Sequence, residues 1–184
     1  GTTANNPFTL ADMTGDGVAD LVMADSASKL RIYRNTSAAG ATPVYAASTF
    51  IKKSDGTTDL LLPDKRFDIG DWNGDGKPDL ITGNFSGNVL LYLNANTAAA
   101  PRYETSSVVD GESYNYYPRF CDLGLNGQTD LVRGINWGGV KYWLNVPENG
   151  LSGSQELIIT ETSGATLDIK PMTDGVIADF ADFN

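Results

Sequence analysis

A short glycine-rich loop in the middle of the chain places oxygen-bearing side chains at alternate positions. It reads Asp71-Trp-Asn73-Gly-Asp75-Gly-Lys77-Pro-Asp79, so side-chain oxygens fall at the first, third, fifth and ninth positions. Calcium is a hard cation that binds six to eight oxygens at about 2.3–2.6 Å. Without a cation, carboxylates placed this closely would repel one another. The loop is therefore predicted to bind Ca²⁺ through these side chains and the main-chain carbonyl of Lys77.

A loop with the same spacing lies closer to the N-terminus. Its side-chain oxygens come from Asp12, Thr14, Asp16 and Asp20, and Val18 stands at the position that would supply a carbonyl. Threonine is a weaker ligand than asparagine or aspartate, so contact through a water molecule is an alternative to direct contact. A second Ca²⁺ site is predicted here.

A third loop keeps only part of the pattern. It retains Asp122, Asn126 and Asp130, with Gln128 at the carbonyl position, but Gly124 at the third position offers no side chain. Because two carboxylates remain, we expect this site to be weak or empty. For the two complete loops, the alternative is a metal-free Asx turn held by hydrogen bonds alone.

The three loops open three copies of one repeat, which align without a gap over residues 12–35, 71–94 and 122–145. Each loop is followed by short β-branched runs separated by a Gly, Ser or Asn turn, which is the pattern of paired strands. The sequence contains no convincing helical pattern, and residues 182–184 begin a fourth copy.

The connectors between copies have room for two more strands each, for example around residues 44–53 and 67–69. Four strands in each repeat are typical of a propeller blade. The sequence therefore predicts an all-β fold in which residues 1–184 form one β-propeller segment. This partial propeller would hold about three four-stranded blades plus the start of a fourth.

Composition limits the function. The chain has 184 residues, with 23 acidic and 13 basic side chains and a formal net charge of −10. Nucleic acid is a poor partner, because phosphate binding needs a basic surface. The sequence has no histidine, the commonest general base, and Cys121 is its single cysteine. No apolar run is long enough to span a bilayer. We assign no catalytic residue.

The loop motif, followed by a strand that ends in Asn35, Asn94 or Asn145, resembles the FG-GAP/VCBS repeat. Proteins with similar repeats include integrin α-subunit propellers, certain fungal lectins, secreted bacterial proteins and some polysaccharide lyases. The resemblance implies a propeller of six to eight blades, calcium loops with a structural role and an extracellular location. Three blades and a fragment cannot close such a ring. The natural protein is therefore expected to be longer, or copies assemble edge to edge.

Aromatic residues gather in and before the third copy, where they could form a binding surface. Trp137 stands at a turn position that is small in the other copies, and Tyr114, Tyr116 and Tyr117 lie in the preceding connector. Flat aromatic faces stack on sugar rings and are enriched at protein interfaces. The alternative for Trp137 is packing between blades.

The sequence thus predicts an extracellular calcium-binding module for adhesion or for recognition of a glycan or protein, without catalysis. Two alternatives remain open. The first is a structural subunit whose blades pair with neighbouring copies in a ring or filament. The second is the propeller part of a secreted polysaccharide lyase, in which a tyrosine of the same connector could act as base.

Overall fold

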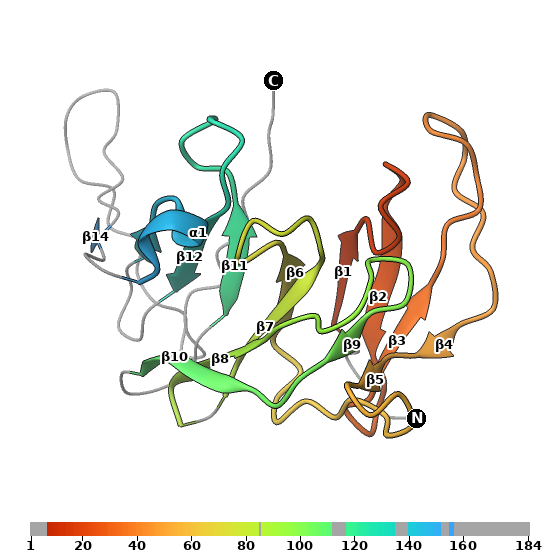
Figure 1. The fold of residues 1–184 in the computed structure, drawn as a ribbon, viewed down its shortest axis with the longest axis horizontal. Coiled ribbons are helices and arrows are strands. Elements are labelled where there is room, and N and C mark those ends of the chain that lie inside the picture. The colour runs from red at the N-terminus through yellow and green to blue at the C-terminus, as the bar shows by residue number, and fades with distance from the viewer. Residues whose placement is uncertain (1–6, 85, 112–116, 135–139, 152–154, 157–184) are drawn as a thin grey trace, which may run out of the picture.

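The computed structural model of this chain describes residues 7–84, 86–111, 117–134, 140–151 and 155–156. These residues form three four-stranded sheets, one two-stranded sheet and one short helix, α1 (Val146–Asn149). The strand pairs within all three four-stranded sheets are antiparallel (Figure 1). The predicted all-β class is confirmed, and the three sheets agree with the expected three four-stranded units.

Each four-stranded sheet takes its strands from one stretch of the chain. The first sheet contains β1 (Phe8–Ala11), β2 (Asp20–Ala24), β3 (Leu30–Tyr33) and β4 (Thr49–Phe50). The second contains β6 (Phe67–Gly70), β7 (Asp79–Gly83), β8 (Asn88–Tyr92) and β10 (Ser107–Gly111). The third contains β11 (Pro118–Cys121), β12 (Asp130–Gly134), β13 (Val140–Trp143) and β14 (Gln155–Glu156).

The register repeats from sheet to sheet. The residue before each loop pairs with the aspartate that closes it, so that Ala11 lies opposite Asp20 and Gly70 opposite Asp79. Each candidate loop therefore joins the first and second strands of its sheet, at the same end of all three sheets. This placement follows from the ungapped repeat, because equal spacing puts equal residues at equal register.

The first strands of the three sheets lie side by side, with β6 between β1 and β11 (Figure 1). The face of a sheet on the side of the preceding sheet is called its front face, and the face on the side of the following sheet is called its back face. The back face of the first sheet, which includes Val22 and Ile32, packs against Phe67 and Ile69 on the front face of the second.

The interface between the second and third sheets repeats this arrangement. Ile81 and Leu91, on the back face of the second sheet, form one buried cluster with Leu131 and Trp143 of the third. Alternation of side chains along each strand gives the sheet two apolar faces, so a middle sheet is buried on both sides. All five residues of β7 are buried, whereas in β2 buried and half-buried residues alternate.

The front face of the first sheet is open. Phe8 and Leu10 occupy the same repeat positions as Phe67 and Ile69, yet they are 60% and 56% exposed, against 2% and 8%. The difference arises because the described structure places no sheet before the first one.

The connectors pair with each other in a way that the sequence did not indicate. In the expected strand region at residues 44–53, the structure forms only β4 and β5 (Lys52–Lys53). Strand β5 pairs in parallel with β9 (Arg102–Tyr103), which belongs to the next connector. No helix in the described part of the chain has the length and apolar character needed to cross a membrane. The predicted fourth copy at 182–184 lies outside the described residues.

Candidate metal centre

The first aspartate of the second loop closes the turn by accepting backbone hydrogen bonds. Asp71 Oδ1 accepts the N–H of Gly74 at 2.8 Å and that of Asp75 at 3.1 Å, while Oδ2 accepts the N–H of Gly76 at 2.7 Å. Gly74 and Gly76 have φ angles of 74° and 77°, which side chains with a Cβ rarely adopt. The two glycines let the chain wrap around the carboxylate.

The first loop folds in the same way. Asp12 Oδ1 accepts the N–H groups of Thr14, Gly15 and Asp16 at 2.7–3.2 Å, and Oδ2 accepts the N–H of Gly17 at 2.7 Å. Partial burial would raise the pKa of Asp12, but these four hydrogen bonds outweigh it and hold the pKa below its ordinary value. The carboxylate is therefore charged over a wide pH range.

The carboxylates at the fifth position are exposed and differ in their partners. Asp16 Oδ1 accepts the N–H of Val18 at 2.9 Å, and Asp75 Oδ1 accepts the N–H of Lys77 at 3.0 Å. Asp75 Oδ2 also pairs with Lys77 Nζ at 2.8 Å. Slight burial would raise the pKa of Asp75, but the Lys77 ammonium and amide, with a bond from Asn73, lower it overall. Sequence spacing indicated a role only for the carbonyl of Lys77 and not for this ion pair.

The ninth-position aspartate differs from the others because it is buried. Asp79 has no exposed surface, and it accepts the N–H of Trp72 on Oδ2 at 3.1 Å and the N–H of Asn94 on Oδ1 at 2.8 Å. Burial, with the nearby charges of Asp75 and Asp71, raises the pKa of Asp79 to about 6, although the two amides oppose the shift. Sequence spacing predicted a ligand here but gave no sign of the burial.

The third loop is closed partly by an amide. Asp122 accepts the N–H of Asn126 at 2.9 Å and of Gly127 at 2.7 Å, as in the other loops. The side-chain amide of Asn126 donates to Asn145 Oδ1 at 3.1 Å. Leu125, at the position of the first loop glycine, has a φ of 50°. An amide donor at the fifth position replaces a carboxylate, which removes one anionic oxygen.

The oxygen donors of the first two loops are of the chemical type that binds calcium. They are carboxylate, amide, hydroxyl and carbonyl oxygens, which hard cations prefer, and both turns are already closed around their first aspartate. Among the described residues, however, no three acidic, histidine or cysteine side chains converge as a ready-made metal cluster. Binding would therefore require the exposed fifth-position side chains, Asp16 and Asp75, to turn toward the cation.

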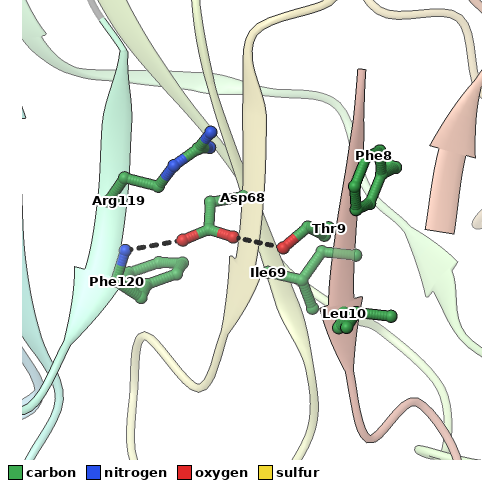
Figure 2. A pocket seen from close by; sticks show the side chains of 7 residues that line it. All are labelled: Phe8, Thr9, Leu10, Asp68, Ile69, Arg119 and Phe120. Carbon is green, nitrogen blue, oxygen red and sulfur yellow. Dashed lines mark hydrogen bonds between the residues drawn. The ribbon is translucent and has the colours of Figure 1, made fainter. Parts of the chain in front are cut away.

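A pocket of about 370 Å³ lies where β1, β6 and β11 meet (Figure 2). Its centre is Asp68, 7% exposed, which accepts the Thr9 hydroxyl at 2.9 Å and the Phe120 N–H at 2.8 Å. Burial raises the pKa of Asp68, opposed by the charge of Arg119 and by these hydrogen bonds. The repeat pattern did not indicate this residue, which ties the first strands of the three sheets together.

The expected aromatic surface is only partly described. Tyr117 lies under the Arg66 guanidinium, whose central carbon is 4.8 Å from the ring centroid. The other three predicted ligand-binding residues, Trp137, Tyr114 and Tyr116, lie outside the described residues. The partly buried Cys121 has its pKa raised to about 12 by burial and nearby aspartates, so its thiol stays protonated at neutral pH.

Comparison with known proteins supports the repeat. Residues 71–133 match the family model of the FG-GAP-like repeat. The match begins at the first aspartate of the second loop and runs through the third loop into β12. Neither the curated proteins nor the solved structures contain a significant match to the chain.

Proposed function

We propose that this chain, which carries an FG-GAP-like repeat at residues 71–133, is a calcium-stabilised segment of an extracellular β-propeller that binds or scaffolds rather than catalyses. The observation that carries the proposal is the closely similar closure of the loops at Asp12 and Asp71. Each presents hard oxygens at the first, third and fifth positions on a glycine turn, between the first and second strands of a sheet.

Calcium would have a structural role in this proposal. Asp12, Thr14 and Asp16, with the carbonyl of Val18, would hold one ion, and the second loop would hold another through the equivalent residues. Asp20 and Asp79 remain candidate ligands at the ninth position. A cation that binds only the folded state stabilises it by mass action. It would also neutralise the carboxylates, which the loop otherwise holds close together.

Calorimetric titration of the chelator-treated chain with CaCl₂ tests this proposal. The expected result is about two ions for each chain and a melting temperature that falls when chelator is added. Asp16→Asn and Asp75→Asn should each remove one ion. Asn126→Ala, at the same position of the third loop, is the matched control and should leave the number at two. An unchanged melting curve together with no bound calcium by elemental analysis would contradict the proposal.

The recognition part of the proposal concerns a glycan or a protein. It is supported by the aromatic residues of the third repeat and its connector, including Tyr117 beside Arg66. Glycan-array binding in calcium, compared between the natural chain and Trp137→Ala, tests the glycan form. If no glycan is bound with both loops loaded, a protein ligand is the form that remains.

Assembly of copies is a second candidate, favoured by the open front face of the first sheet. Phe8 and Leu10 are exposed there, although their repeat equivalents are buried. Sedimentation at increasing concentration tests it. A mass that grows with concentration and returns to one copy in Phe8→Ser/Leu10→Ser supports assembly through this face. A constant monomer mass at all concentrations argues against it.

A further inference from the structure

We propose that the ninth-position aspartates, Asp20, Asp79 and Asp130, act as metal-independent clamps that hold each loop to the asparagine two residues after the third strand of its sheet. These asparagines, Asn35, Asn94 and Asn145, are called the closing asparagines below. The inference goes beyond calcium binding and does not depend on it, because every contact that carries it lies within the chain.

The clamp has the same geometry in the first two repeats. Asp20 Oδ2 accepts the N–H of Met13, the second loop residue, at 3.1 Å, and Oδ1 accepts the N–H of Asn35 at 2.7 Å. In the second repeat the corresponding distances to Asp79 are 3.1 Å and 2.8 Å. One carboxylate therefore joins the start of the loop to an asparagine that lies fifteen residues after the aspartate itself.

Burial makes these hydrogen bonds important for stability. All three aspartates have no exposed surface, so water cannot replace a lost backbone partner. A buried carboxylate is stable only when its oxygens accept hydrogen bonds. Replacing it leaves the backbone N–H groups that it paired with unsatisfied. The aspartates at the first and fifth positions are exposed or half-buried and are not under this constraint.

The third repeat separates clamping from metal binding. Its loop has lost the third-position side chain and the fifth-position carboxylate. Asp130 nevertheless accepts the N–H groups of Leu123 and Asn145, both at 2.7 Å. The contact pattern is kept where these two cation donors are missing, so the clamp does not need them.

The closing asparagines carry the connection further in the first two repeats. Asn35 Oδ1 accepts the N–H of Ser37 at 3.1 Å, and Asn94 Oδ1 accepts those of Asn96 at 3.0 Å and Arg102 at 3.2 Å. The clamp thus fixes the loop relative to the connector that follows the hairpin. In the third repeat the side chain of Asn145 instead accepts the Asn126 amide.

Asparagine substitution tests the clamp, because it keeps the size but turns one oxygen into an NH₂ group facing a backbone N–H. Asp79→Asn and Asp130→Asn should each lower the melting temperature in excess EGTA by roughly 5 °C. Asp75→Asn, in the same loop as Asp79 but exposed, is the matched control and should change it by no more than about 2 °C. Asp130→Asn should also leave the number of bound calcium ions unchanged.

The clamp is overturned if Asp79→Asn and Asp130→Asn melt in EGTA at the temperature of the natural chain. Amide hydrogen exchange of the natural chain in EGTA keeps the test decisive if a variant fails to fold. The N–H groups of Trp72, Asn94, Leu123 and Asn145 should then be protected, compared with the exposed Gly40. Exchange of these four amides as fast as that of Gly40 in EGTA would equally overturn it. Loss of calcium binding with the amides still protected would refute only the proposed function.

Discussion

Replacing Phe67 with alanine should cost far more stability than the same change at Phe8. The two phenylalanines hold equivalent positions in β6 and β1, but Phe67 is 2% exposed and Phe8 is 60% exposed. A fully buried Phe→Ala change costs about 3–5 kcal/mol, which includes the cavity it leaves. Phe8 has less than half of its surface to lose and leaves an open notch, so roughly 1 kcal/mol is expected. The difference between the two variants should reach about 2 kcal/mol or more.

Urea unfolding at 25 °C, followed by tryptophan fluorescence, measures both costs as the shift of the midpoint multiplied by the m-value. The repeat itself supplies the control, because the residue type, strand position and substitution are the same. Equal losses at Phe8 and Phe67 would refute the reasoning, since they would mean that the front face of the first sheet is covered in solution. A Phe8→Ala loss that appears only at high protein concentration would point to a second copy as the cover.

Three further predictions follow from the contacts between sheets and from the third loop. Asp68→Asn should stabilise the chain at pH 7 and lose this advantage toward pH 4 in urea titrations. Unlike the two backbone N–H groups at Asp79, the Thr9 hydroxyl can rotate to accept a hydrogen bond from the new amide. The raised pKa means that Asp68 contributes most below its ordinary value of 3.8 and progressively less as the pH rises through its folded-state pKa; an advantage that grew on acidification would contradict this. Gly70→Ala should destabilise by about 1–3 kcal/mol, because its Cβ would lie 2.6 Å from the Phe120 ring. Phe120→Ile should recover part of the loss, because Ala11 and Ile69 hold the equivalent positions at the interface between the first and second sheets. Additive losses in this double-mutant cycle would argue against the contact. Gly124→Asn with Asn126→Asp should raise the bound calcium from two ions to three by calorimetry, and a number that stays at two would show that the third loop is limited by its backbone rather than its side chains.

The repeated part of the fold was predictable because its signals are local. The glycine loop fixes where the first strand ends at Gly70 and the second begins at Asp79. The alternating β-branched run then gives β7 and β8. The connectors were less predictable, because their strands pair over long sequence distances. Strand β5 is only two residues long and finds its partner β9 in the next connector, and no local pattern specifies that pairing.

The candidate site was predictable in composition but not in orientation. Spacing identified the oxygens at Asp12 and Asp16, which the structure places on one closed turn. It could not show that Asp20 is buried and paired with Asn35, because that contact joins residues fifteen apart in the sequence. One signal was available. The third loop keeps Asp130 although it lacks the third-position side chain and the fifth-position carboxylate, which indicates a role besides metal binding.

The two faces of each sheet give the array a direction. Fronts pack on backs, and Asp68 contacts Thr9 on one side and Phe120 on the other, so no two interfaces along the series are mirror images. Adding a sheet at one end would bury a different surface from adding a sheet at the other. A cut between β4 and β6 would expose Phe67 and Ile69 in one product and Val22 and Ile32 in the other. A structure of this kind is a stack of sheets with two chemically different ends. Its two ends should differ in their tendency to fray, to aggregate and to accept a new neighbour.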